Sequence, residues 1–226
     1  SLDGLVKVWD LSAQCCTQTI ASHHGPVGAG VCRKLFDDER WRLVTGGNDG
    51  QVRVWSVNTE NKSDDDLCEF MGTLIPPPNV AISNEKISCI QFHGRLVGIL
   101  HTNSKNVDIY LARSTQESLK KLQRRLKRRQ EKQKKSAEET SIGPKRGLLD
   151  DPDDEKDAEL GLEEQVDPER IKASDEFEYV ATMRATHKLR SFAFVPKEKG
   201  EIGRLVCALS TNALETHSLI RKAEGV

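Results

Sequence analysis

Long apolar runs are missing from this sequence of 226 residues, in which apolar residues make up only 36% of the total. No apolar stretch approaches the roughly 20 residues that a membrane-spanning helix requires. An initiator Met and a targeting segment are also missing, and the first residues already carry the end of a repeating unit. The sequence therefore predicts an internal part of a longer, soluble intracellular protein that has no membrane partner.

Metal-binding and catalytic signatures are missing as well. None of the six cysteines stands in a CxxC pair, and no histidine has the spacing of a zinc ligand set. Cys32, Cys89 and Cys207 lie in apolar, strand-like runs, which is typical of reduced, buried thiols. There is no catalytic carboxylate pair, nucleophile elbow or phosphate-binding glycine loop. We therefore expect no enzyme activity, no metal, no cofactor and no small-molecule substrate.

An internal repeat is the strongest feature that the sequence does contain. Residues 1–11 (SLDGLVKVWDL) match residues 47–57 (GNDGQVRVWSV) at a single offset of 46 residues. That offset is close to the roughly 40–45 residues of one β-propeller blade. Each segment has an Asp-Gly turn followed by alternating apolar residues, a pattern typical of a hairpin that leads into a strand. The coinciding pairs are Asp3 and Asp49, Gly4 and Gly50, Val6 and Val52, Val8 and Val54, and Trp9 and Trp55.

The residues between the two hairpins predict the other strands of a four-stranded blade. Strands are expected at 16–21, 27–35, 41–46 and 52–57, with residues 16–21 as the outer strand. Gly25-Pro26 and the polar residues 37–40 are typical of the turns between strands.

The segments VKVWD and HHGPV…LVTGGNDGQVRVWS resemble the WD-repeat family. The resemblance implies a buried hydrogen-bonded network of His23, Thr45, Asp49 and Trp55. In the preceding blade, Asp3 and Trp9 stand at the corresponding positions. Such a network satisfies polar groups that would each cost about 1–3 kcal/mol if they were buried without partners. Ser22 and Ser56 depart from the family signature, which usually has Gly and Asp at these places.

Two weaker repeats follow the strong one. Their expected strands are 87–92, 96–102 and 107–111 in the first, and 189–195, 205–209 and 214–219 in the second. Ser104 and Thr211 stand where the hairpin Asp is expected, so we expect apolar packing to hold these blades together. The predicted fold class is all-β, a WD-repeat β-propeller fragment of about three to four blades, with an inserted basic α-helix and a disordered acidic linker.

The predicted helix lies between the third and fourth repeats. Residues 114–137 contain no Gly or Pro and are rich in good helix formers. Ser114 and Glu117 fit a capping box, and Leu119, Leu122 and Leu126 form a narrow apolar stripe. The candidate contacts to RNA phosphates are Lys120, Lys121, Arg124, Arg125, Lys127, Arg128, Arg129 and Lys132.

Three interpretations of this helix stay open at the level of sequence. It is a solvated charged helix, a nuclear-targeting segment, or a surface that binds the phosphate backbone of RNA. No aromatic residue interrupts the basic run, so it offers no platform on which bases could stack. Any contact with RNA is therefore expected to be independent of base sequence.

An acidic segment with three prolines follows the helix and is typical of a disordered linker. The expected division of the chain is propeller blades at 1–112, a basic helical insertion at 113–137, an acidic disordered linker at 138–175, a further blade at 176–220 and the start of the next connection at 221–226.

The order of these elements resembles one family in particular. A strong blade, a degenerate blade ending in NVDIYLA, the helix SLKKLQRRLKRRQEKQKK, an acidic linker and a blade of the form KLRSFAF…RLVCALSTNALETHSL are similar to the WD-repeat-containing protein 3 family. The resemblance implies tandem propellers in the small-subunit processome of the nucleolus.

The function implied by the resemblance is that of a non-catalytic scaffold in small ribosomal subunit biogenesis and rRNA processing, in the nucleus and nucleolus. Its expected partners are other WD-repeat subunits of the processome, the U-three small nucleolar ribonucleoprotein with its snoRNA, and precursor ribosomal RNA. The alternative is a WD-repeat adaptor of another complex, such as a ubiquitin-ligase substrate receptor or a chromatin subunit. The basic helix beside an acidic linker favours the scaffold, because adaptors seldom need such a charged arm.

Overall fold

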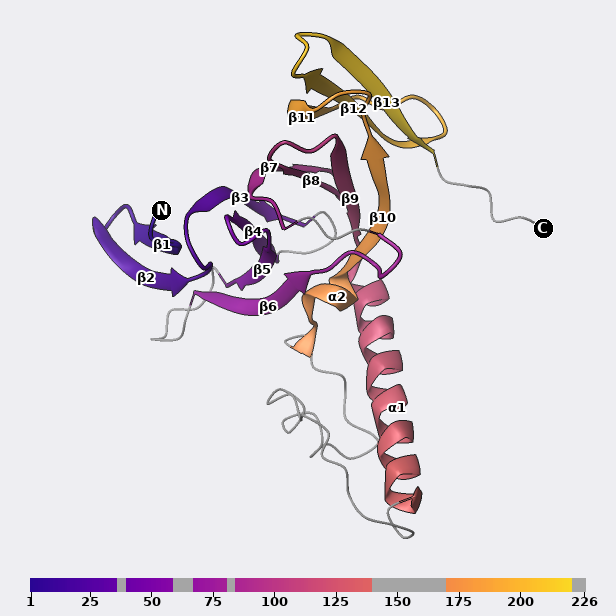
Figure 1. Cartoon of the computed structure of the whole chain (residues 1–226). Helices are drawn as coiled ribbons and strands as arrows, with labels where there is room; N and C mark the ends of the chain where they lie inside the picture. The colour runs from indigo at the N-terminus through magenta and orange to yellow at the C-terminus, as the bar shows by residue number, and fades with distance from the viewer. Residues whose placement is uncertain (36–39, 59–66, 81–83, 140–169, 221–226) are drawn as a thin grey trace, which may run out of the picture.

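Antiparallel sheets are the main regular structure in the part of the chain that this computed structural model describes. The structure describes residues 1–35, 40–58, 67–80, 84–139 and 170–220, with the backbone alone described over 133–139. Four sheets follow one another within these residues, and a long helix extends away from them (Figure 1). This arrangement is consistent with part of a WD-repeat β-propeller.

Each sheet consists of antiparallel neighbours. The first sheet pairs β1 (Leu5–Asp10) with β2 (Cys15–Ala21). The second has the order β3 (Val27–Lys34), β4 (Trp41–Gly47), β5 (Val52–Val57), β6 (Cys68–Leu74). The third joins β7 (Ile87–His93), β8 (Leu96–His101), β9 (Asn106–Ala112) and β10 (Phe177–Arg184). The fourth joins β11 (Leu189–Val195), β12 (Glu201–Leu209) and β13 (Leu214–Ile220).

The apolar core lies between neighbouring sheets. One buried cluster joins the second and third sheets and includes Val44, Val54 and Ile99. Another joins the third and fourth sheets through residues such as Ile109 and Leu205. These side chains come from the apolar positions of the strand patterns, because alternate residues of a half-buried strand face the same side.

Glycine allows these sheets to pack closely. A Cβ atom on Gly46 would lie 2.4 Å from Cγ2 of Ile87, and one on Gly98 would lie 2.5 Å from Cε2 of Phe192. Both glycines therefore stand where the side chain of the neighbouring sheet fills the space that a Cβ atom would need.

The outer strand of the second sheet differs from the sequence prediction. Residues 16–21 were expected in the same blade as 27–35, but β2 pairs with β1, and β6 completes the second sheet instead. The physical reason is the tight turn after Asp10, whose carboxylate accepts hydrogen bonds from the N–H groups of Ser12 and Ala13. That turn returns the chain directly onto β1.

The assignment of residues 176–220 to one blade was wrong at its first strand. β10 pairs with β9, from Phe177 opposite Ala112 to Arg184 opposite Asn106. Phe177 and Ala112 are buried in the core that the third sheet shares with the second. The insertion therefore connects two neighbouring strands of one sheet, and only β11–β13 form the fourth sheet.

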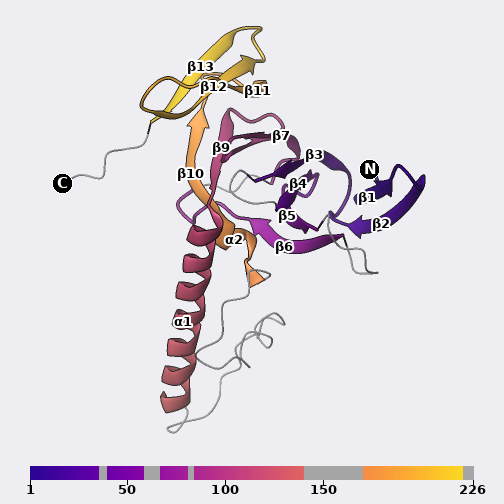
Figure 2. The ribbon, with the colours of Figure 1, turned by 180° about the vertical axis from the view of Figure 1, so that it is seen from behind.

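The helices lie at this connection. α1 (Thr115–Glu139) follows β9, and the short α2 (Ala173–Glu176) precedes β10. Seen from behind, the base of α1 lies beside α2 and β10, and the rest of α1 points away from all four sheets (Figure 2). The helix thus begins where the sequence predicts and extends two residues beyond the expected end at 137.

Candidate functional site

The structure brings His23, Thr45, Asp49 and Trp55 together in one buried network. His23 Nδ1 lies 3.0 Å from Asp49 Oδ1, and His23 Nε2 lies 3.0 Å from Thr45 Oγ1. Trp55 Nε1 donates to the same hydroxyl over 3.1 Å. Because an ionised carboxylate only accepts, Nδ1 carries the proton, Nε2 accepts from Thr45, and Thr45 accepts from Trp55. Every polar atom in this chain of hydrogen bonds is satisfied.

Gly47 makes room for this network, and the hairpin pattern in the sequence does not single it out. A Cβ atom at this position would lie 2.5 Å from His23 Nδ1 and 2.7 Å from Asp49 Oδ1. Asp49 also accepts hydrogen bonds from the N–H groups of Gln51 and His24, at 3.1 and 3.2 Å. The hairpin turn and the polar network are therefore one structural unit.

Both titratable groups of the network have displaced pKa values. Burial lowers the pKa of His23 below its ordinary value of 6.5, against the opposing effect of Asp49. Burial alone would raise the pKa of Asp49, but its hydrogen bonds to Gln51, His23 and His24 outweigh this and lower it below 3.8. The folded chain therefore favours neutral His23 and ionised Asp49.

Mild acid should weaken this part of the fold. A lowered His23 pKa means that its contribution to stability is complete above pH 6.5 and is lost as the pH falls through the folded value. We expect the free energy of unfolding, measured by urea denaturation, to fall between neutral and mildly acid pH, and to fall less in His23→Gln. If the free energy of unfolding depended on pH equally in the two proteins, the lowered pKa of His23 would be contradicted.

The corresponding residues of the first hairpin are arranged differently. Asp3 Oδ1 accepts from the N–H of Leu5 over 3.0 Å and so shapes its turn as Asp49 does. Trp9, however, is 56% exposed, whereas Trp55 is only 6% exposed. Within the described residues, the first sheet has two strands and does not enclose its tryptophan.

A second polar network holds the third sheet, which we expected to depend mainly on apolar packing. Thr182 Oγ1 donates to Asp108 Oδ1 over 2.5 Å and lies 2.7 Å from the hydroxyl of Tyr179. His101 Nε2 lies 3.8 Å from the other carboxylate oxygen of Asp108. Burial beside Asp108 raises the pKa of Tyr110 and keeps its hydroxyl neutral. The sequence alone does not reveal this network, because Tyr179 and Thr182 lie beyond the insertion.

The N-terminus of α1 is capped as predicted. The Ser114 N–H donates to Glu117 Oε2 over 2.8 Å, and the Glu117 N–H donates to Ser114 Oγ over 3.3 Å. Glu117 also pairs with Arg95, and Arg40 donates to Thr115 Oγ1 over 2.6 Å. The first turn of the helix is therefore tied to both the second and the third sheets.

One side of α1 packs on residues 170–176, the segment that returns from the insertion to β10. Leu122 is fully buried, while Leu119 and Leu126 are half-buried. Lys121 Nζ donates to the carbonyl oxygen of Ser174 over 2.7 Å. Arg125 Nη2 lies 3.1 Å from Asp175 Oδ2 and donates to the carbonyl oxygen of Arg170 over 3.2 Å.

These contacts correct two sequence predictions. Lys121 and Arg125 were candidate phosphate contacts, but their charged groups hold the returning segment because they flank the buried Leu122. Residues 138–175 were expected to be a disordered linker, but residues 170–175 pack at the base of α1, with Ile171, Ala173 and Asp175 buried. The rest of the expected linker, residues 140–169, lies outside the described residues.

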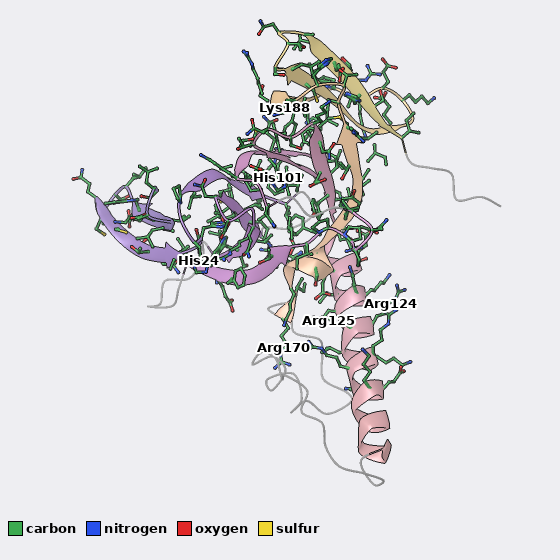
Figure 3. All side chains as sticks on the ribbon, viewed as in Figure 1. His24, His101, Arg124, Arg125, Arg170 and Lys188 are labelled. Atoms are coloured by element: carbon green, nitrogen blue, oxygen red, sulfur yellow. The ribbon has the colours of Figure 1, made fainter. Side chains whose placement is uncertain are left out.

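The other candidate phosphate contacts face solvent to different degrees. Arg129 is half-buried, whereas the remaining five are exposed: Lys120, Arg124, Lys127, Arg128 and Lys132. Figure 3 shows Arg124 and Arg125 on opposite sides of α1, with Arg125 on the side of Arg170. The helix therefore has one face that contacts the protein and one that is open to a partner.

The described residues contain no group of three or more His, Cys, Asp or Glu side chains suited to holding a metal ion. Among the helices of that same part of the chain, none is long and apolar enough to span a lipid bilayer.

Comparison with known proteins adds short similarities. No protein-family model matches the chain. It is 32% identical over 77 residues to Mitochondrial division protein 1 of Kluyveromyces lactis, covering 31% of this chain and 10% of that protein. It is 34% identical over 67 residues to GATOR2 complex protein WDR24 of Xenopus laevis, covering 29% and 8%.

A third similarity is to the CCR4-associated factor 4 homolog of Candida glabrata, with 31% identity over 72 residues that cover 30% of this chain and 12% of that protein. The chain thus spans about a tenth of the length of each of these relatives. Together with the repeated Asp-Gly hairpins and the antiparallel sheets, these similarities to WD-repeat proteins support a WD-repeat relationship for this chain.

Proposed function

We propose that this chain belongs to a non-catalytic scaffold that acts in the nucleolus on precursor ribosomal RNA, within the small-subunit processome. The observation that carries the proposal is the exposed basic face of α1, which extends away from the sheets while its other face is anchored. WD-repeat similarity by itself suggests a scaffold or adaptor, because sheets of this kind present surfaces for other macromolecules. The exposed basic helix favours RNA as the partner of this scaffold.

The chemistry of α1 supports a backbone contact with nucleic acid. Its exposed lysines and arginines carry the charge that neutralises phosphates and releases their counterions. The sequence of α1 has no aromatic residue, so bases gain no stacking surface on it. Such a face supports attachment to RNA of any sequence, which suits a scaffold on a long precursor.

An adaptor of another multiprotein complex is the second candidate. One relative is named as a protein of the GATOR2 complex, which favours assembly with other protein subunits. In that case the sheets would bind protein partners, and RNA would play no part.

Affinity purification of the tagged full-length protein tests the two candidates. We expect precursor ribosomal RNA, the U-three small nucleolar RNA and other WD-repeat subunits to co-purify after ultraviolet cross-linking, and the protein to be located in the nucleolus. Co-purification of ubiquitin-ligase or chromatin subunits without precursor ribosomal RNA would contradict the scaffold and favour the adaptor.

A further inference from the structure

The exposed face of α1 has a defined extent. Lys120, Arg124, Lys127 and Arg128 follow the spacing i, i+4, i+7 and i+8, so they lie on one side of the helix. At 1.5 Å of rise per residue, they cover about 12 Å of the helix axis. Exposed Glu117 and Glu131 lie before and after them. We call these four residues the outer basic face.

The helix that carries this face is held firmly at its base. The capping box, the Arg95–Glu117 pair and the Arg125–Asp175 pair fix α1 to the sheets and to the returning segment. That segment is itself anchored by a buried ion pair, in which Arg42 Nε lies 3.0 Å from Glu176 Oε2. The four charges are therefore presented on a rigid, oriented helix.

We propose that the outer basic face binds the phosphate backbone of double-stranded RNA in preference to single-stranded RNA. This inference rests on the proposed function and deepens it by naming the form of RNA that the helix contacts. The outer basic face recognises the duplex by charge and position, without reading its sequence.

The rigidity of α1 and its lack of aromatic side chains both favour binding of double-stranded RNA over single-stranded RNA. The phosphates of a duplex already occupy fixed positions, and both strands contribute charge along a short length of axis. A flexible single strand would lose conformational freedom when its phosphates align with four fixed charges. Proteins offset that loss by stacking bases on aromatic rings, and α1 has none. Contacts of duplex RNA with proteins depend largely on shape and backbone, which suits a helix of this chemistry.

The test compares two RNA probes on the full-length protein: a blunt RNA duplex and an unstructured single strand with the same number of phosphates. One variant replaces Lys120, Arg124, Lys127 and Arg128 with Gln. The control replaces four exposed lysines away from α1 with Gln, which changes the net charge equally; these are Lys7, Lys188, Lys197 and Lys199. Dissociation constants are measured over a range of salt concentrations.

We expect the unmodified protein and the control to bind the duplex more tightly than the single strand. In the outer-face variant, duplex affinity should fall by about tenfold or more, and the slope of log K against log salt should become shallower by roughly 3 to 4, since each phosphate contact contributes about 0.9. Equal or tighter binding of the single strand would overturn this inference and leave the proposed function standing.

Two other results separate this inference from the proposed function. If neither probe binds and no precursor RNA co-purifies, both fail. If duplex binding is unchanged in the outer-face variant while an acidic protein no longer co-purifies, the inference is overturned and the outer basic face belongs to a protein interface.

Discussion

Replacement of Glu176 with alanine should lower the free energy of unfolding by about 3–5 kcal/mol, because it leaves the guanidinium of Arg42 buried without its carboxylate. Glu176 is fully buried and Arg42 is 2% exposed. Both carboxylate oxygens of Glu176 accept from Arg42 Nε, at 3.1 and 3.0 Å. Urea denaturation of the chain would measure the loss, and protease cleavage within residues 170–176 should become faster.

Two comparisons identify the source of this effect. Glu178→Ala, two residues further on, removes an ion pair to Arg113 from a side chain that is 52% exposed, so its cost should stay below about 1 kcal/mol. The double variant Arg42→Met with Glu176→Leu removes both charges and should recover most of the stability, because a well-packed apolar pair can replace a buried ion pair. A loss for Glu176→Ala no larger than that for Glu178→Ala would contradict the anchoring role of the pair.

Trp55→Ala should destabilise the second sheet by about 3–5 kcal/mol, the range for removal of a large buried aromatic side chain. Its ring lies 5.0 Å from the ring of Phe70, centroid to centroid, and its Nε1 donates to Thr45. The substitution removes both the packing and the hydrogen bond. Thermal or urea unfolding, followed by circular dichroism, provides the measurement.

Trp9 offers a matched control for Trp55, because it stands at the same place in the preceding hairpin but is 56% exposed. Trp9→Ala should therefore cost less than about 1 kcal/mol in this chain. Trp55→Phe should cost about 1–2 kcal/mol, since it keeps much of the packing and loses the N–H donor. Equal losses of stability in Trp55→Ala and Trp9→Ala would contradict a stabilising role for the buried network around Trp55.

The sequence was informative wherever the interacting residues belong to one repeat. His23, Thr45, Asp49 and Trp55 lie within a single repeat unit, so the hairpin pattern and the family resemblance were enough to place them together. Ser114 and Glu117 are three residues apart, and the capping pattern identified the start of α1. Local spacing determines geometry in both cases.

Interactions across the insertion could not be read from spacing. Asp108 bonds to Thr182, 74 residues away, and Arg42 to Glu176, 134 residues away. Glu176 stands in an acidic stretch whose composition resembles the linker, which hid its buried position. Asp108, an isolated carboxylate inside the apolar run NVDIYLA, was the one available signal of a polar partner.

The faces of α1 were only half predicted. The leucine stripe located the buried side correctly at Leu122, but Lys121 and Arg125 border that stripe and were still counted as phosphate contacts. At 3.6 residues per turn, a residue one before or three after a buried position lies within reach of the packed surface.

Ser56, which departs from the WD signature, also has a structural reason: its hydroxyl accepts from Arg42 over 3.1 Å.

The pairing of β9 with β10 has a consequence for synthesis of the chain. Residues 113–176 separate the two strands, so a ribosome adding about 5–20 residues per second needs roughly 3–13 s to deliver the second after the first. During this interval the nascent edge of β9 is open to wrong strand partners, which unpaired edges attract. The residues made meanwhile are mostly charged or polar, with few β-branched or aromatic side chains. They compete poorly for that edge and leave it available for β10.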